Sequence, residues 1–415
     1  MGQTLVIAEK PSVAGDIARA LGGFKKDGDF WVSDAMIVGS AVGHLLEIKA
    51  PEEYDVKRGR WSFANLPVLP PHFDLQPIKK SIKKFEGLEK KIRSRSVTDI
   101  INACDAGREG ELIFRYIIQA TGTKKPIRRL WLQSMTKASI QKAFTALRSD
   151  AEMKPLEAAA RSRSEADWLV GINGTRALTA FNSKDGGFFL TTVGRVQTPT
   201  LAIVVAREEE ITHFKPQNYW EVHATFGAQA GDYDSVWVDA DFKKTKGQSA
   251  ELKPERLWTA AEAQAIVAKC QGKLGIVTDH KRRATSAPPA LFDLTSLQRE
   301  ANGRFGFPAK MTLAILQRLY ERHKVLTYPR TDSRALPEDY PETMKETLSH
   351  LQKLEAYNAF AGQILMSGWV KGDNRRIFDN KKISDHFAIV PTGELPKDLE
   401  ETEQKIYDLV VRRTM

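Results

Sequence analysis

The 415-residue chain has only two cysteines, Cys104 and Cys270. Two cysteines cannot build a four-cysteine zinc site, and they cannot form the disulfide framework of a small secreted protein. Cys104 follows an apolar run, so it is expected to be a small buried hydrophobic residue. The cysteine content therefore argues against both a zinc–thiolate centre and a disulfide-stabilised fold.

Long apolar runs and targeting signals are also missing. No uninterrupted run approaches the roughly 20 apolar residues that a membrane-spanning helix needs. The N-terminal sequence GQTLVIAEKP lacks the basic start and small-residue cleavage site of a signal peptide. There are no internal repeats or Gly/Ser-rich linkers, and no GxxxxGK[ST] loop supports the use of ATP. We expect an intracellular protein with no membrane partner.

What the chain has in excess is positive charge. It carries 62 Lys and Arg against 52 Asp and Glu, a net charge of +10. This balance favours a polyanionic partner such as nucleic acid. The length exceeds that of one ordinary hydrophobic core, so about two to four domains are expected.

Two segments share a strand–turn–helix pattern. In TLVIAEKPSVAGDIARALGG, Ser12 is a candidate helix N-cap and Gly22-Gly23 a candidate C-cap. In VTDIINACDAGREGELIFRYIIQATG, an acidic turn separates the strand from the helix. Polar residues at the carboxyl ends of both strands predict an α/β domain with its site at that edge of the sheet.

The rest of the chain changes period twice. A helical pattern from about 154 to 210 includes TLAIVVAREEEI. Between 219 and 283 the period becomes two, in YWEVHATF, SVWVDADF and LGIVTDHKR, which predicts strands around the more helical TAAEAQAIVAKC. A second helical block follows and ends in the loop LTYPRTDSRALP.

The acidic turn DAGREGE has two interpretations. Glu9 ends one strand and Asp105 another, so these acids could converge with Glu109 and Glu111 on one point. Hard carboxylate oxygens suit Mg²⁺, which typically takes one or two protein carboxylates. Acids are also favourable at any solvated helix N-terminus, with no metal involved. The turn alone does not decide between them.

The loop LTYPRTDS is a second candidate. Pro329 forces Tyr328 out of helical geometry, and Arg330 follows. A tyrosine hydroxyl, with a pKa of about 10, becomes a nucleophile only where cationic groups stabilise its anion. Arg330 could do that, or could hold a phosphate with two hydrogen bonds. Most tyrosines are packing residues, which is the competing interpretation.

Other loops carry residues suited to phosphate. GRVQTPT contains Arg195, Gln197 and Thr198, SDHFAIVPT contains His386, and AVGHLLEI contains His44. A single histidine in such a loop is more often structural than catalytic.

Taken together, the motifs resemble the type IA DNA topoisomerases, and most closely their bacterial topoisomerase III branch. Eight elements occur in the order of that family and run to about residue 392: VIAEKPSVA, AVGHLLEI, DAGREGELI, RLWLQSMT, ADWLVGINGTRAL, VGRVQTPTL, LTYPRTDS and DHFAIVPT. One such motif is weak evidence, whereas eight in order are specific.

The resemblance implies a multidomain α/β plus α+β fold that forms an incomplete toroid. Its parts are a Toprim (Rossmann-like) domain at 1–150, the first part of a helical DNA-binding domain at 151–215, the first part of a β-rich arch at 216–284, a winged-helix-type domain with the nucleophilic tyrosine at 285–398, and a return into the arch at 399–415.

The resemblance also implies roles for individual residues. Tyr328 matches the nucleophile that attacks a phosphodiester in single-stranded DNA, becomes linked to the 5′ phosphate and leaves a free 3′ hydroxyl. The remaining matches are Arg330, which positions the tyrosine and phosphate; Glu9 and Lys10 beside the scissile phosphate; Asp105 and Glu109, with Glu9, as metal-site acids; His386 lining the cleavage site; and Arg195, Gln197 and Arg176, with Lys10 and Arg330, as DNA-binding residues.

The implied activity is Mg²⁺-dependent, ATP-independent cleavage and religation of single-stranded DNA, with strand passage for relaxation or decatenation. The implied setting is a monomer in the bacterial cytoplasm, nucleoid-associated or plasmid-borne, with a helicase as a possible partner. Two other functions stay open at this stage: a Toprim-type nuclease or primase, and a single-strand-binding module without catalysis.

The chain departs from the family pattern in two places. The pattern D-x-D-x-E reads D-A-G-R-E here, with Gly107 where a second Asp would stand. Either the metal is held by fewer carboxylates, or the turn needs a glycine at positive φ. The chain also stops at Met415, where family members usually continue, so we expect a truncated chain.

Overall fold

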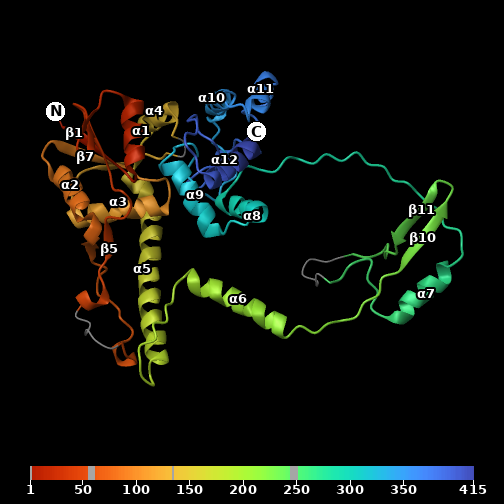
Figure 1. The fold of residues 1–415 in the computed structure, drawn as a ribbon. Helices are drawn as coiled ribbons and strands as arrows, with labels where there is room; N and C mark the ends of the chain where they lie inside the picture. The colour runs from red at the N-terminus through yellow and green to blue at the C-terminus, as the bar shows by residue number, and fades with distance from the viewer. Residues whose placement is uncertain (1, 55–60, 133–134, 244–250) are drawn as a thin grey trace. The chain divides into compact units, whose positions relative to one another are not determined.

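The computed structural model describes residues 2–54, 61–132, 135–243 and 251–415. It divides into two units, of which the first combines Met1–Arg195 with Ala287–Met415 and the second is Val196–Ser286 (Figure 1). No helix in the described ranges is long and apolar enough to cross a membrane. The division into five domains stays a prediction.

A seven-stranded mixed sheet forms the centre of the N-terminal part of the first unit. The central strand β1 (Gln3–Ala8) pairs in parallel with β4 (Met36–Ser40) on one side and with β7 (Val97–Ala103) on the other. The strand order is β2-β3-β4-β1-β7-β8-β9. The outer strands are β2 (Lys25–Asp27), β3 (Phe30–Val32), β8 (Ile127–Arg129) and β9 (Arg148–Ser149). The α/β domain expected from the sequence is therefore confirmed.

Helices cover both faces of this sheet (Figure 1). On one face lie α1 (Pro11–Leu21) and α4 (Lys137–Thr145); on the other lie α2 (Ile82–Arg93) and α3 (Arg108–Thr121). Alternate residues of β1 enter the two cores, Leu5 and Ile7 on the α2–α3 side and Val6 and Ala8 on the α1–α4 side. Burial on both faces explains why the strand reads as a continuous apolar run.

Helix α1 begins earlier than predicted. Its N-cap is Lys10 and its first residue is Pro11, so the prediction of Ser12 as N-cap is wrong. Proline is well suited to the first helical position because its missing N–H would have no partner there. The predicted glycine C-cap is confirmed, since Gly22 has a φ of 75°. Lys10 is therefore held in extended backbone between strand and helix.

A long helix, α5 (Asp150–Asn182), packs against α3. A capping box between Ser149 and Glu152 begins it. The hydroxyl of Tyr116 on α3 donates to Ser164 Oγ at 2.8 Å. Smaller elements nearby are the pair β5 (Leu46–Ile48) and β6 (Leu75–Pro77) and the 3-10 turns η1 (Pro51–Glu53), η2 (Phe63–Asn65) and η3 (Lys79–Ser81).

The C-terminal part of the first unit is a helical block with its own core. It contains α8 (Leu294–Phe305), α9 (Ala309–Glu321), α10 (Pro341–Leu351), α11 (Asn358–Met366), η4 (Asn380–Lys382) and α12 (Glu401–Thr414). Leu316, Ile389 and Tyr407 are among its fully buried residues. A bridge between Leu326 and Pro391 brings the LTYPRTDS loop beside the DHFAIVPT segment.

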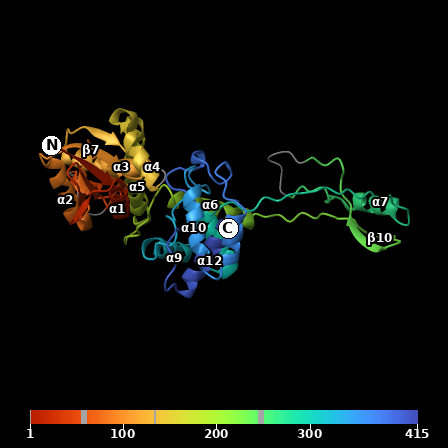
Figure 2. The same ribbon diagram turned by 90° about the horizontal axis from the view of Figure 1, so that it is seen from above.

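The second unit consists of α6 (Gln197–Thr212), an antiparallel hairpin of β10 (His223–Ala228) and β11 (Gly231–Val236), and α7 (Ala260–Cys270). Helix α7 lies beside the hairpin in both ribbon views (Figure 2). The strand predicted in LGIVTDHKR is wrong, because this run has no strand partner and Leu274 and Ile276 are fully exposed. An apolar alternation does not form a strand without a neighbour to pair with.

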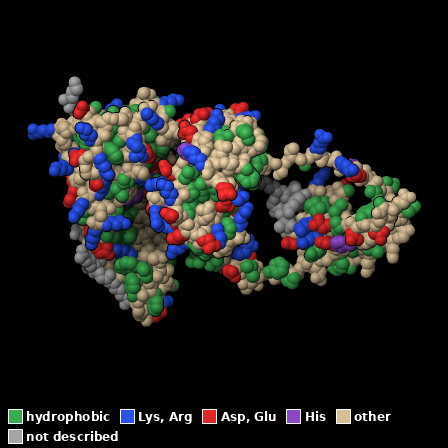
Figure 3. Space-filling model, turned by 45° about the horizontal axis from the view of Figure 1, so that its top comes forward, with side chains coloured by type: hydrophobic (Ala, Val, Ile, Leu, Met, Phe, Trp, Pro, Cys, Tyr) green, Lys and Arg blue, Asp and Glu red, His purple; other side chains and the backbone are tan. Residues whose placement is uncertain are grey.

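Charged side chains are spread over the surface. On the face shown in Figure 3, Lys and Arg lie interspersed with Asp and Glu. The surplus of positive charge is therefore not confined to a single patch on this face.

Candidate active site

The carboxyl ends of β1 and β7 form the base of the candidate site. Ala8 is aligned with Ala103 in the parallel pair, so the residues that follow the two strands lie side by side. Lys10 Nζ lies 2.6 Å from Asp105 Oδ2 and 3.9 Å from Glu9 Oε1. The expectation that the two strand ends bring Glu9 and Asp105 together is confirmed.

The electrostatics of these strand ends follow from their partial burial. Burial and the neighbouring Asp105 carboxylate raise the pKa of Glu9. Burial alone would lower the pKa of Lys10, but its hydrogen bond and charge interaction with Asp105 raise it overall. Lys10 therefore stays cationic at neutral pH, while Glu9 holds a proton more readily than an exposed glutamate.

The turn that follows Asp105 depends on two glycines for different reasons. At Gly110, an added Cβ would lie 2.7 Å from Asp105 N and closer still to its carbonyl oxygen, so only glycine fits there. Gly107 has a φ of −163°, which any residue can adopt, so the expectation that it needs a positive φ is wrong. A Cβ on Gly107 would instead lie within 2.7 Å of both carboxylate oxygens of Asp385.

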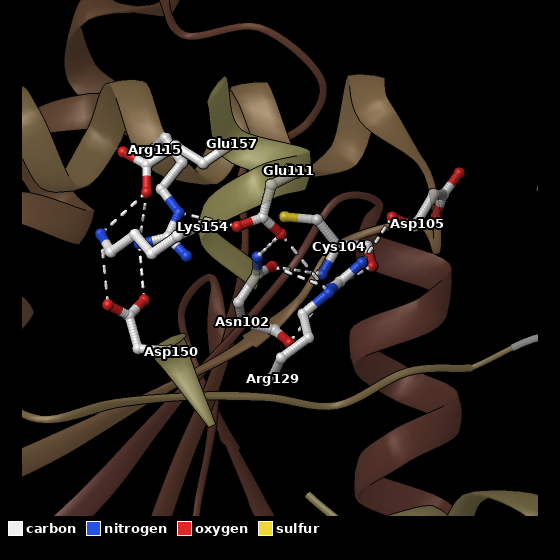
Figure 4. A network of polar contacts seen from close by, with 9 residues as sticks. All are labelled: Asn102, Cys104, Asp105, Glu111, Arg115, Arg129, Asp150, Lys154 and Glu157. Carbon is white, nitrogen blue, oxygen red and sulfur yellow. Dashed lines mark hydrogen bonds and ion pairs between the residues drawn. The ribbon is translucent and has the colours of Figure 1, made fainter. Parts of the chain in front are cut away.

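A buried network of hydrogen bonds and ion pairs supports this turn on its protein-facing side (Figure 4). The guanidinium of Arg129, 1% exposed, donates from Nη1 to the carbonyl oxygens of Asn102 and Cys104 at 3.1 and 2.7 Å. Its Nη2 donates to the carbonyl oxygen of Asp105 at 2.7 Å. Three backbone carbonyls, one in β7 and two in the turn that follows it, thus accept hydrogen bonds from one planar guanidinium, which fixes the path of the backbone.

Glu111 belongs to this network and not to the site. It is fully buried and accepts from Arg115 Nε at 2.7 Å and from Asn102 Nδ2 at 2.9 Å. Arg115 continues the network to Asp150 at 2.6 Å and Glu157 at 3.2 Å. The expectation that Glu111 converges with the other acids is wrong, because its position in the first turn of α3 points it into the protein.

Glu109, also in the first turn of α3, points outward and meets a histidine. His44 Nε2 lies 2.5 Å from Glu109 Oε1. The hydrogen bond from His44 is the main cause that lowers the pKa of Glu109. The AVGHLLEI motif therefore supplies a partner that keeps Glu109 ionised beside the acidic turn.

Tyr328 lies among residues from the sheet edge. Lys10 Nζ is 4.1 Å from the centroid of its ring, and the ring of His386 is 4.3 Å away, centroid to centroid. His386 Nε2 in turn lies 3.4 Å from Asp105 Oδ2. Tyr320, on α9, packs edge-on against Tyr328 at 5.3 Å. The structure thus brings together Tyr328, Lys10, His386 and Asp105 from four separate motifs.

Two hydrogen bonds fix the loops that carry Tyr328 and His386. Thr327 N donates to Val390 O at 3.0 Å, and Thr331 Oγ1 donates to His386 O at 2.8 Å. Burial lowers the pKa of His386 to about 4, so its imidazole is neutral at pH 7. A neutral imidazole can donate a hydrogen bond from one nitrogen and accept one at the other.

The predicted DNA-binding residues occupy different environments. Arg330 is exposed and makes no ion pair within the described ranges. Arg195, about half exposed, lies 2.6 Å from Asp167 of α5. Arg176 is buried, 2.5 Å from Glu52 and 5.2 Å from the ring of Trp61. Gln197 is the first residue of α6, in the second unit. Their roles toward DNA stay predictions.

The carboxylates suit Mg²⁺ in kind. Glu9 Oε2 is buried and has no hydrogen-bond partner in the described part of the chain, which leaves one acceptor for a cation. Glu9 and Asp105 supply the hard oxygen ligands that Mg²⁺ prefers. Among the described residues, however, no group of three or more His, Cys, Asp or Glu side chains stands ready to hold a metal ion. The candidate metal ligands are therefore present, but no three of them in the described part of the chain form a ready-made metal site.

Three residues of the site were not predicted from the sequence: Asp385, Arg129 and Tyr320. A signal existed for two of them, since Asp385 directly precedes His386 and Arg129 lies in the RLWLQSMT motif. Tyr320 lies in an ordinary amphipathic helix, and nothing in that pattern sets it apart.

Comparison with known proteins places the chain in a family. The Toprim domain model matches residues 4–135, and the DNA topoisomerase model matches residues 151–415, more than half of the chain. DNA topoisomerase 3 from Bacillus licheniformis is 41% identical, that from Bacillus subtilis 40% and that from Bacillus cereus 42%, each over 100% of this chain and 54% of its own length. The chain therefore spans about half the length of the curated relatives it matches.

Among solved structures, full-length topoisomerase I from Thermotoga maritima matches with a TM-score of 0.55 and 22% identity, over 99% of this chain and 60% of that one. This likeness supports the fold. With the two family models covering both parts of the sequence, the chain belongs to the type IA DNA topoisomerase family.

Proposed function

We propose that the chain carries the strand cleavage and religation chemistry of a type IA DNA topoisomerase, acting on single-stranded DNA without ATP. The observation that carries the proposal is the position of Tyr328 against Lys10 and His386, with Asp105 in contact with both of these. A tyrosine beside a lysine whose pKa is raised is placed where its anion is stabilised.

In the cleavage step, Tyr328 Oη attacks the phosphorus of a phosphodiester and the bond to the 3′ oxygen breaks. The phenol loses its proton to solvent water, and the leaving 3′ oxygen takes a proton from Glu9. Glu9, whose pKa is raised by burial and Asp105, can hold the proton that the leaving oxygen takes. The phosphate remains joined to Tyr328 as a phosphodiester, so the 3′ hydroxyl can reverse the step without ATP.

The neighbours of Tyr328 have separate tasks in this proposal. Lys10 offsets negative charge as the phenolate and the phosphate approach each other. Exposed and unpaired among the described residues, Arg330 is available to bind the phosphate with two parallel hydrogen bonds. His386 orients the phosphate as a neutral donor. Arg195, Gln197 and Arg176 hold the strand on either side.

Toprim domains generally bind Mg²⁺, which neutralises phosphate charge when bound. Glu9 and Asp105, with Glu109, are the residues that would hold it here. In the whole protein the same chemistry would serve strand passage for relaxation or decatenation, in a cytoplasmic monomer assisted by a helicase.

The test is covalent attachment to DNA. The chain is incubated with Mg²⁺ and a single-stranded oligonucleotide labelled at its 3′ end, and the products are separated by denaturing electrophoresis. We expect a labelled protein–DNA adduct that is absent in Tyr328→Phe and present in Tyr320→Phe, which removes the neighbouring hydroxyl instead. Free fragments without an adduct would indicate a nuclease, and binding without cleavage would indicate a single-strand-binding module.

A further inference from the structure

The carboxylate of Asp385 lies directly over Gly107 in the acidic turn. A Cβ at position 107 would lie within 2.7 Å of both oxygens and the Cγ of Asp385, closer than real Cβ contacts allow. The backbone of Gly107 is extended and accepts any residue, so the obstacle to a side chain is the Asp385 carboxylate itself. Two segments far apart in the sequence thus place one glycine and one carboxylate in complementary positions.

The surroundings of Asp385 contain more acids than bases. Partial burial and the charges of Asp105, Asp332 and Glu109 raise the pKa of Asp385, and the charge of Arg108 lowers it. Asp385 is exposed, and within the described ranges no hydrogen bond or ion pair engages its carboxylate, so a cation can reach it from solvent. Like charges repel one another, and a bound divalent cation would offset that repulsion. Glu9 Oε2, buried without a partner, is a second acceptor left open at the same sheet edge.

We infer that Asp385 is a ligand of the divalent cation at the acidic turn, and that it supplies the carboxylate that position 107 lacks. The ligand is a hard divalent cation such as Mg²⁺ or Mn²⁺, since every donor is a carboxylate oxygen. This inference rests on the proposed function only in assuming that the Toprim turn binds such a cation.

A consequence concerns the two parts of the first unit. Asp105 and Glu9 belong to the sheet, whereas Asp385 belongs to the segment that also carries His386, whose ring packs against Tyr328. A cation held by both would bind more tightly when the helical block is seated on the sheet. Cation binding and the positioning of Tyr328 would then favour each other by the same free energy.

The experiment measures cation binding without DNA. Mn²⁺ is titrated into the 415-residue chain, and free Mn²⁺ is measured by electron paramagnetic resonance. We expect Asp385→Asn, which keeps the shape and removes the charge, to weaken Mn²⁺ binding by about tenfold or more. Asp373→Asn, an exposed acid of the same block, should leave binding unchanged. The double variant Gly107→Asp/Asp385→Ala should recover most of the lost affinity, because the alanine vacates the space that the Asp385 carboxylate fills and the new carboxylate at position 107 can occupy it from the other segment.

Circular dichroism and thermal melting of each variant show that it is folded before its affinity is compared. Equal Mn²⁺ affinity in the wild type and Asp385→Asn would overturn the inference, as would a wild type that binds no Mn²⁺. Loss in Asp385→Asn without recovery in the double variant would contradict the claim that both positions serve one ligand. The DNA adduct of Tyr328 is measured in a separate experiment. If no adduct forms, the Mn²⁺ affinities can still be compared, because they are measured without DNA.

Discussion

Lys10 contacts both the acidic turn and the candidate nucleophile. Its ammonium lies 2.6 Å from Asp105 Oδ2 and 4.1 Å from the Tyr328 ring centroid. A divalent cation held by Asp105 would share this carboxylate with the ammonium. Lys10 and the cation therefore both offset the charge of Asp105, and the phosphate of a bound strand would draw the lysine toward itself.

The two arginines assigned to DNA should respond differently to removal. Arg330 is exposed beside Tyr328, and Arg195 is paired with Asp167 on α5. We expect Arg330→Ala to slow cleavage more than it weakens binding, because the proposed role of Arg330 is to act on the phosphate whose charge changes in the transition state. Arg195→Ala should weaken binding by a similar or larger factor than it slows cleavage.

Single-turnover cleavage rates and oligonucleotide affinities, measured for both variants, check this division. The wild type and Lys345→Ala, a substitution on the exposed surface of α10, serve as controls. Equal losses of rate and affinity in both variants would contradict it.

At the scale of elements, the buried ion-pair network beneath α3 is expected to contribute strongly to stability. Glu111, fully buried, lies between Arg115 and the almost fully buried Arg129. Glu111→Gln keeps the shape but leaves two buried guanidinium groups with less negative charge. Removing one member of a buried ion pair typically costs about 3 kcal/mol or more, so we expect a loss of that size in the free energy of unfolding.

Urea unfolding followed by circular dichroism measures this loss. Glu401→Gln, which breaks an exposed pair with Lys405 on α12, is the matched control and should leave the midpoint unchanged. An unfolding midpoint for Glu111→Gln equal to that of the wild type would show that the network does not hold the turn.

Helix α8 provides a test with pH. Asp293 caps it by accepting from Ser296 N at 2.6 Å and also pairs with Arg334 at 2.9 Å. Burial alone would raise the pKa of Asp293, but the hydrogen bonds from Ser296 and the pair with Arg334 lower it overall. A lowered carboxyl pKa stabilises the folded state above the usual aspartate value of about 4, and this stabilisation disappears as the pH falls through the lowered pKa.

We therefore expect Asp293→Ala to lose roughly 1 kcal/mol at pH 7, the usual value of an N-cap. Asp293→Asn keeps a capping oxygen and should lose less. The difference in the free energy of unfolding between the wild type and Asp293→Asn should shrink below about pH 4. In this range the Asp293 carboxylate of the wild type becomes protonated, whereas the asparagine of the variant has no charge at any pH. Urea unfolding at pH 7 and pH 3 tests it, and a difference that stays constant with pH would show that the charge of Asp293 contributes nothing.

The sequence predicts well those helices and strands that are determined by the hydrophobic pattern and turn residues of their own segment. Both strand–turn–helix units and the helix in TLAIVVAREEEI are present, and the two strand ends meet because parallel strands in one sheet must align. The strand predicted in LGIVTDHKR is absent because pairing depends on a partner that the run itself does not reveal. Glu111 was misplaced for a related reason, since a turn motif does not show which first-turn positions face the core.

The site was predictable to a similar extent. Tyr328 and Asp105 carry recognisable motifs, and their neighbourhood follows from the resemblance to the family. Asp385 over Gly107 could not be foreseen, because it depends on how the helical block is seated on the sheet. A missing side chain in one motif and a carboxylate in another become related only in three dimensions.

For the whole molecule, the net charge of +10 predicts how binding depends on salt. Each phosphate of single-stranded DNA that a Lys or Arg neutralises releases counterions and contributes about −0.7 to the slope of log affinity against log salt concentration. A chain that contacts about four phosphates should therefore lose roughly fiftyfold in affinity between 50 and 200 mM salt. On the face in Figure 3, basic side chains lie interspersed with acids. The salt dependence should therefore reflect the individual Lys and Arg side chains that contact phosphates, and not a broad positive surface.

Fluorescence anisotropy with a labelled oligonucleotide, repeated at several salt concentrations, gives this slope. Tyr328→Phe should keep the slope and bind within a few fold of the wild type, because it removes the proposed nucleophile and no charge. Arg195→Ala should reduce the magnitude of the slope by about 0.7, because the proposed role of Arg195 is to neutralise one phosphate of the strand. An affinity that does not change with salt would show that binding does not use the basic side chains, and an unchanged slope in Arg195→Ala would place the DNA strand elsewhere.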